Sequence, residues 1–169
     1  MNIEKTNLEG VLIVTPDVYT DERGMFMETF SEMRYREMLG LTPHEHFVQD
    51  NLSVSKKGVL RGLHYQAPPI AQGKLVSVLR GRVLDVAVDI RAGSPTYGEH
   101  VVAELSGDNH RQLWIPRGFA HGFITLEDDT LFAYKCTNAY SREHERGIVW
   151  NDPALGIDWG EATPIVSEK

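Results

Sequence analysis

Three ionisable side chains interrupt apolar runs of this sequence and could move protons. They are His64, Asp85 and Tyr134. An imidazole titrates near neutral pH and can accept a proton, whereas a phenol has a pKa of about 10 and remains a proton donor. Taken singly, each residue also has a structural explanation: a hydrogen-bonded histidine, a solvated carboxylate and a packed tyrosine.

The alternation of side chains along a strand predicts which residues share a face with these groups. Residues two apart in a strand point the same way, so His64 should lie beside Gly62 and Gln66, where small neighbours leave room for a ligand. In the strand that carries Tyr134, this residue should share a face with Phe132 and Cys136. In the strand that carries Asp85, one face should hold Asp85, Ala87 and Asp89, and the other Leu84, Val86, Val88 and Ile90. At a sheet edge, Asp85 and Asp89 would instead be solvated charges.

The elements that must position these groups are mainly strands. Short apolar runs alternate with Gly, Pro, Asn and Asp at a spacing of about 8–12 residues, which favours an all-β jelly-roll barrel with a few short helices. Runs that are apolar on both faces indicate two-layer packing or a sheet buried in a dimer. Ser31–Leu39 is the one predicted helix. The predicted strands are Val11–Val14, His46–Val54, Val59–Gln66, Lys74–Leu79, Arg82–Arg91, Glu99–Leu105, Arg111–Ile115, Ala120–Leu126, Leu131–Thr137 and Gly147–Trp150.

Composition restricts the class of protein and its partners. The 169 residues fit a single domain, 1–169, and carry a net charge of −7, which argues against nucleic acid as a partner. No apolar run is long enough to cross a bilayer, and no secretory signal is visible at the N-terminus. One cysteine, Cys136, excludes an internal disulfide. We therefore expect a cytoplasmic protein that uses neither membrane nor nucleic acid.

The spacing Pro116-x-Gly118-x-x-His121 resembles the second conserved motif of cupin barrels, in which the histidine enters the barrel. The first cupin motif, His-x-His with a downstream Glu, is replaced by His64-Tyr65-Gln66. A cupin metal usually needs three or four ligands. Because only His64 and His121 match, we predict that no metal is bound.

Several segments together resemble the dTDP-4-dehydrorhamnose 3,5-epimerase family, in order from about residue 7 to residue 169. They are Thr20–Glu28, Phe47–Asn51, Val59–Gln66, Gln72–Val76, Ile115–Phe123, Tyr134–Asn138, Trp150–Pro153 and Gly156–Trp159. The resemblance implies a dimeric cupin-type jelly roll that uses no cofactor. It also implies a dTDP-linked 4-keto-6-deoxyglucose substrate, with inversion at C3 and C5 giving dTDP-4-keto-L-rhamnose.

The resemblance assigns catalytic roles to five residues. Both C3 and C5 flank the C4 ketone, so loss of either proton leaves an enolate that can be reprotonated from the other face. His64 matches the family's base and Tyr134 its acid, while Lys74 matches the cation beside the enolate oxygen. His121 and Asp85 resemble a second histidine–carboxylate pair near the sugar, in which the carboxylate fixes the imidazole tautomer.

Binding residues follow from the same resemblance. Arg23, Arg61 and Lys169 are candidates for phosphate or nucleotide contacts. The guanidinium of arginine presents a planar fork that suits phosphate. The Arg23–Glu28 segment is expected to reach the partner subunit's site. The remaining candidates are Phe26 for stacking on the base, Gln49 and Asn51 for base or sugar edges, Glu28 and Glu145 for the nucleotide, and Tyr140, with Lys74 and His121 also touching substrate.

One departure concerns the partner of the base. In the family, an aspartate that follows a Ser-x-Lys segment orients this histidine, and here Ser167-Glu168-Lys169 are the last residues given. We expect the natural chain to continue with that aspartate, because without it the tautomer of the imidazole would lack support.

Three alternatives remain at this stage. An epimerase acting at C3 only would carry nearly the same residues. A metal-dependent cupin, such as a dioxygenase or isomerase, would use His64 and His121 as ligands. A sugar-nucleotide-binding module without catalysis would bind dTDP, and its function would survive His64→Ala.

Overall fold

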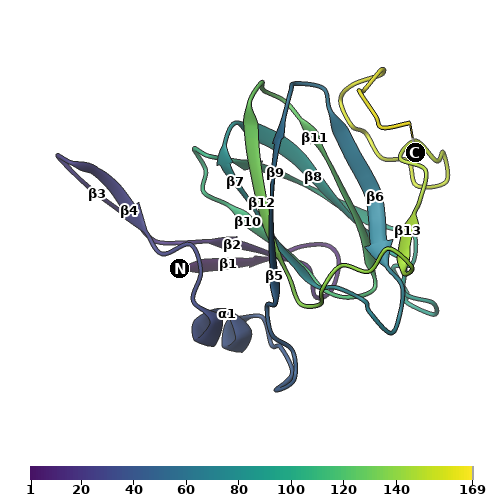
Figure 1. The fold of residues 1–169 in the computed structure, drawn as a ribbon, viewed down its shortest axis with the longest axis horizontal. Helices are drawn as coiled ribbons and strands as arrows, with labels where there is room; N and C mark the ends of the chain where they lie inside the picture. The colour runs from purple at the N-terminus through teal and green to yellow at the C-terminus, as the bar shows by residue number, and fades with distance from the viewer. Residues whose placement is uncertain (169) are drawn as a thin grey trace.

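The computed structural model describes residues 1–168 and consists mainly of strands (Figure 1). The predicted all-β jelly roll is confirmed, with one α-helix in this part of the chain rather than a few. The helix is α1 (Glu32–Met38); the strands are β1 (Asn2–Lys5), β2 (Leu12–Thr15), β3 (Val18–Asp21), β4 (Gly24–Met27), β5 (Gln49–Ser55), β6 (Leu60–Gln66), β7 (Lys74–Arg80), β8 (Arg82–Asp89), β9 (His100–Ser106), β10 (Gln112–Ile115), β11 (Phe119–Thr125), β12 (Thr130–Cys136) and β13 (Glu145–Gly147).

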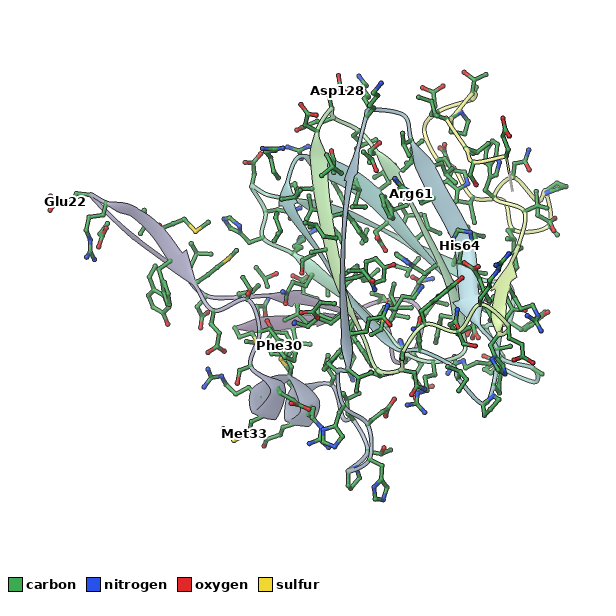
Figure 2. The ribbon with its side chains drawn as sticks, viewed as in Figure 1. Glu22, Phe30, Met33, Arg61, His64 and Asp128 are labelled. Atoms are coloured by element: carbon green, nitrogen blue, oxygen red, sulfur yellow. The ribbon has the colours of Figure 1, made fainter. Side chains whose placement is uncertain are left out.

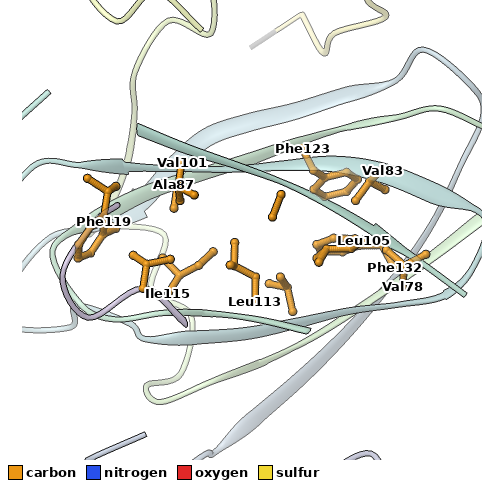
Figure 3. Close-up of a cluster of buried hydrophobic side chains, with 14 residues drawn as sticks. Val78, Val83, Ala87, Val101, Leu105, Leu113, Ile115, Phe119, Phe123 and Phe132 are labelled. Carbon is orange, nitrogen blue, oxygen red and sulfur yellow. The ribbon is translucent and has the colours of Figure 1, made fainter. Parts of the chain in front are cut away.

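Two antiparallel sheets pack face to face around the main core. The six-stranded sheet has the order β1-β2-β10-β7-β12-β5, and the five-stranded sheet has the order β13-β6-β11-β8-β9. Their facing sides contribute to one apolar cluster (Figure 3), formed by Leu8, Val11, Val76, Val78, Val83, Ala87, Val101, Ala103, Leu105, Leu113, Ile115, Phe119, Phe123 and Phe132. Each large side chain fully buried there stabilises the fold by about 1.5–3 kcal/mol.

Both sheets also carry apolar residues on their outer faces, as the sequence predicts. The C-terminal segment covers the five-stranded sheet, where Trp159 is buried and its indole N–H donates to the carbonyl of Trp150. Helix α1 covers part of the six-stranded sheet through Tyr35 and Leu39. These segments cover much of the five-stranded sheet and part of the six-stranded sheet from outside.

Strand β6 contains a β-bulge opposite β11, where Gly62 and Leu63 together oppose Gly122. An extra residue shifts the alternation of a strand by one position. Arg61 and His64, three residues apart, therefore point to the same side, whereas strict alternation would separate them.

Close backbone contact makes glycine necessary at this bulge. Gly62 has a φ of +124°, and a Cβ atom there would lie 2.5 Å from the Cα of Gly122. On the other strand, a Cβ at Gly122 would lie 2.8 Å from the carbonyl oxygen of Arg61. Leu60 and Leu63 both pack in the outer apolar layer, as the shifted alternation requires.

Asp89 is buried rather than solvated at a sheet edge, so that alternative is wrong for this residue. Its carboxylate accepts hydrogen bonds from the backbone N–H and guanidinium of Arg91 and from the hydroxyls of Ser94 and Thr96. The bonds from Arg91 hold the pKa of Asp89 well below its usual range, although burial opposes the shift. Asp89 thus anchors the turn after β8 and has no part in the site.

Strands β3 and β4 form a hairpin, hereafter the arm, that extends away from the sheets (Figure 1). Neither these strands nor β1 is among the strands predicted from the sequence. Each has only four residues and lies mostly exposed, so no apolar face marks it. Three large apolar side chains on the arm, Tyr19, Met25 and Phe26, are exposed.

The predicted strand Gly147–Trp150 is mostly wrong. Strand β13 ends at Gly147, and the chain then turns so that Ile148 and Trp150 both pack on the outer apolar layer. Apolar residues two apart here reflect packing of an irregular segment. The predicted strand starting at His46 likewise begins later, at Gln49.

Gly62→Ala should destabilise the fold because its methyl group would collide with backbone atoms. We expect a loss of about 1–3 kcal/mol beyond the cost of a matched variant, Gly24→Ala. Gly24 has a similar φ, +129°, but a Cβ there meets nothing within 4 Å. Thermal or urea unfolding of both variants measures the difference. Equal stabilities would show that backbone contact at the bulge is unimportant.

Candidate active site

A cavity of about 970 Å³ opens between the two sheets at one end of the core. Residues of β5, β6, β7, β11 and β12 line it, so both sheets provide walls. Six residues predicted from the sequence lie in this lining: Asn51, Arg61, His64, Lys74, His121 and Tyr134.

His121 and Asp85 form a buried pair on the five-stranded wall. The imidazole Nε2 lies 3.0 Å from each carboxylate oxygen of Asp85. Asp85 is fully buried, so its alternative role as a solvated edge charge is wrong. The His121 ring stacks near Phe132 at a centroid distance of 6.1 Å. A carboxylate on one ring nitrogen orients the imidazole and sets its tautomer.

His64 lies on the same wall as this pair. Its Cα is the register partner of His121 across β6 and β11, so the two imidazoles are carried on neighbouring strands. Figure 2 shows His64 and Arg61 on β6, and both residues are exposed. The Arg61 Nε donates a hydrogen bond to the Ser55 hydroxyl at 3.2 Å, which ties β6 to β5 of the opposite sheet.

Lys74 and Tyr134 lie together on the six-stranded wall. The Lys74 Nζ is 5.8 Å from the centroid of the Tyr134 ring. Burial lowers the pKa of Lys74, while Cys136, Asp85 and Glu145 act in the opposite direction. Burial also raises the pKa of Tyr134, so the phenol keeps its proton at neutral pH. The wall therefore offers a protonated phenol beside an amine whose charge is partly desolvated.

Four predicted binding residues are linked by hydrogen bonds that begin in the cavity and end outside its lining. The Gln49 Nε2 donates to Asn51 Oδ1 at 3.1 Å, and the backbone N–H of Tyr140 donates to Gln49 Oε1 at 2.8 Å. The Tyr140 hydroxyl donates to Glu145 Oε2 at 2.9 Å. These contacts join β5 to the loop after β12 and to β13, giving a polar rim.

Three predicted binding residues, two on the arm and one directly after it, do not join this cavity in the same chain. Arg23 pairs with Asp21, and Glu28 pairs with Arg34. Phe26 is 71% exposed. The arm, with Glu22 near its tip, extends from the opposite side of the molecule to His64 (Figure 2). The predicted contact of the arm with the partner subunit's site stays a prediction. Lys169, another predicted binding residue, lies outside the described residues.

Sequence reasoning missed part of the cavity lining. Ser53 lines it from β5, and Ile165, Val166 and Ser167 line it from the C-terminal segment. Polar residues at alternate positions, Asn51 and Ser53, are a signal that was available. For the C-terminal wall, the family resemblance pointed to the Ser167 segment, but no local pattern marked Ile165 and Val166, which are held by an isolated parallel bridge between Val59 and Ile165.

Two features of residues 1–168 bear on other functions. No group of three or more His, Cys, Asp or Glu side chains is arranged there to hold a metal ion. The predicted lack of a metal stays a prediction. Nor does this part of the chain contain a helix with the length and apolar character needed to cross a membrane.

Comparison with known proteins gives one consistent result. Residues 5–169 match the family model of dTDP-4-dehydrorhamnose 3,5-epimerase. The enzyme of that name from Shigella flexneri is 54% identical over 169 residues, covering 100% of this chain and 92% of its own. A dTDP-4-dehydrorhamnose 3-epimerase from Streptomyces niveus is 37% identical, covering 100% of this chain and 81% of its own.

A solved structure agrees with both the sequence match and the fold. It is dTDP-6-deoxy-D-glucose-3,5-epimerase from Legionella pneumophila in complex with dTDP-4-keto-L-rhamnose. It superimposes with a TM-score of 0.95 at 55% identity, covering 99% of this chain and 88% of that chain.

Cys136, buried beside Lys74 and Asn51, should react slowly with thiol reagents. Burial raises its pKa to about 11, so the reactive thiolate forms only at strongly alkaline pH. At pH 8 we expect native protein to react about 100-fold more slowly than urea-unfolded protein. Stopped-flow measurement with an aromatic disulfide reagent tests this. Equal rates in the two states would contradict it.

Proposed function

Because the chain belongs to the dTDP-4-dehydrorhamnose 3,5-epimerase family, we propose that it inverts C3 and C5 of dTDP-4-keto-6-deoxyglucose, giving dTDP-4-keto-L-rhamnose. One observation carries the proposal. Two protonatable groups of different kinds, an imidazole on the five-stranded sheet and a phenol on the six-stranded sheet, line opposite walls of one cavity. Inversion needs such groups on opposite faces of a ring.

In the proposed reaction, His64 removes the proton from a carbon beside the C4 ketone. The electron pair of the broken C–H bond forms the enolate, whose oxygen takes the negative charge. Tyr134 then gives its proton to the opposite face of the same carbon, and proton exchange with solvent restores both side chains. Burial favours this role, since the raised pKa of Tyr134 keeps the donor protonated.

Lys74 is proposed to stabilise the enolate oxygen. It lies beside Tyr134 in a partly desolvated wall, where a fixed cation near a developing charge acts more strongly than in water. Loss of one such group costs about 3–4 kcal/mol in comparable sites. His121, held by Asp85 through Nε2, would offer Nδ1 as a hydrogen-bond acceptor to a hydroxyl in the same region of the sugar.

The polar rim is proposed to bind the nucleotide. Gln49, Tyr140 and Glu145 already hold one another in place, which lowers the entropy that binding must remove. Arg61 is exposed at the open side of the cavity, where its guanidinium can reach a diphosphate. No cofactor is needed for proton transfer beside a ketone, and a cytoplasmic location is part of this proposal.

We further propose that the active form is a homodimer in which each arm completes the partner's site. Two features of the single chain support this. The arm carries Phe26 and Arg23 in exposed positions remote from its own cavity. The outer face of β5 and β7 exposes Leu52, Val54 and Leu79, an apolar surface that a second copy can cover.

Reaction in deuterated water tests the epimerase. Each enolate recaptures its hydrogen from solvent, so product should carry deuterium at C3 and C5. His64→Ala should abolish turnover, and Tyr134→Phe should slow it by about 10²–10⁴-fold while dTDP binding persists. NMR of the product measures both positions.

The labelling pattern also separates the alternatives. Deuterium at C3 alone would identify the 3-epimerase activity named for the Streptomyces niveus relative. Absence of label from both carbons, with dTDP still bound, would reject an epimerase and favour a binding module.

Complementation tests the arm. An Arg23→Ala/Phe26→Ala variant and a His64→Ala variant should each be inactive, because every site lacks either the arm or the base. When the two variants are co-expressed and pair at random, about half of the dimers contain one copy of each. In such a dimer one of the two sites combines an intact cavity with an intact arm, so about one quarter of wild-type activity should return. If the arm serves its own chain, the mixture will stay inactive.

A further inference from the structure

Four polar side chains, Gln49, Asn51, Ser53 and Ser55, occupy alternate positions on β5, and their bonding differs. The amide of Asn51 bonds to Gln49 and to the Cys136 sulfur. Ser55 accepts a hydrogen bond from Arg61. Between them, the hydroxyl oxygen of Ser53 is buried and has no hydrogen-bond partner among residues 1–168. A desolvated hydroxyl without a partner destabilises a protein, so its presence needs a reason.

Packing does not supply that reason. Ser53 is the register partner of Phe132, one of the most deeply buried side chains of the core. An alanine there would fit the strand equally well without burying a hydroxyl. Ser53 also lines the cavity together with Tyr134 and Arg61, so the unpartnered hydroxyl belongs to the wall that a ligand would contact.

The position of Ser53 along β5 indicates which part of a ligand it meets. Gln49, at the start of the strand, belongs to the polar rim. Ser53 lies four residues further along β5, beyond Asn51. Strand β5 pairs with β12, where Tyr134 is the register partner of Asn51. The sugar rather than the nucleotide would occupy this inner part. A hydroxyl both donates and accepts, which matches a sugar hydroxyl.

We propose that Ser53 binds the C2 hydroxyl of the hexose and is a specificity-determining residue of the site. The inference rests on the proposed function. The keto sugar has free hydroxyls at C2 and C3 only. Inversion at C3 moves that hydroxyl, whereas the C2 hydroxyl keeps its configuration throughout. A side chain fixed on a strand therefore suits C2, where it can hold the ring during both inversions.

Ser53→Ala tests the proposal. We expect kcat/KM for the keto sugar to fall about 3- to 10-fold, the effect of one neutral hydrogen bond. The Kd for dTDP should stay within about 2-fold. The Tm should be unchanged or higher, because the lost hydroxyl had no protein partner. With the 2-deoxy analogue of the substrate, wild type and variant should have equal kcat/KM.

Ser106→Ala is the matched control. Ser106 is also a buried strand serine, but its hydroxyl accepts a hydrogen bond from the Asn109 backbone N–H, so this variant should lower Tm and leave kcat/KM unchanged. If wild type turns over the keto sugar and Ser53→Ala has the same kcat/KM, the role of Ser53 is overturned and the proposed epimerase activity stands. Weakened dTDP binding would overturn the role of Ser53 in favour of a phosphate contact. Wild type without turnover would remove the proposed function and this inference together.

Discussion

The site depends on the close approach of two backbones at Gly62 and Gly122. This contact permits the bulge in β6, and the bulge brings Arg61 and His64 to one side of the strand while Leu60 and Leu63 remain in the outer apolar layer. A regular strand would send one of the two polar side chains into that layer. The fold thus combines a buried five-stranded sheet with a wall that presents both an imidazole and a guanidinium.

The two walls differ in how they hold their polar groups. On the five-stranded wall, His121 is fixed by a direct contact with the buried carboxylate of Asp85. On the six-stranded wall, Lys74 and Tyr134 are fixed mainly by packing. Burial lowers the pKa of Lys74 and raises the pKa of Tyr134, so it favours the neutral form of each side chain. Asp85 also favours the Lys74 cation across the cavity. One buried carboxylate therefore serves both walls, because charge interactions are strong where water is excluded.

The spacing of strands and turns predicted the all-β fold and most of the long strands. Interrupted apolar runs pointed to His64 and Tyr134, whereas the other four predicted cavity residues came from the family resemblance. Strand prediction succeeded where a strand is buried on both faces, as in β8 and β11, because apolar residues then mark the whole element. It failed where strands gain no burial within one chain, as in the arm, and where register is irregular. A bulge depends on contact between two distant glycines, which no local pattern records.

The openness of the cavity gives a physical reason for the proposed dimer. Enolate chemistry gains from excluding water, since a stabilised negative charge is worth more in a dry site. In the single chain His64 and Arg61 are exposed, and so is Phe26 of the arm. An exposed apolar hairpin is unfavourable for stability, and an exposed site is unfavourable for catalysis. If two copies exchange arms, the arm of each copy covers the cavity of the other and is itself buried there. Under this arrangement, assembly and catalysis share one energetic cause, so a lone subunit would fold without becoming an efficient enzyme.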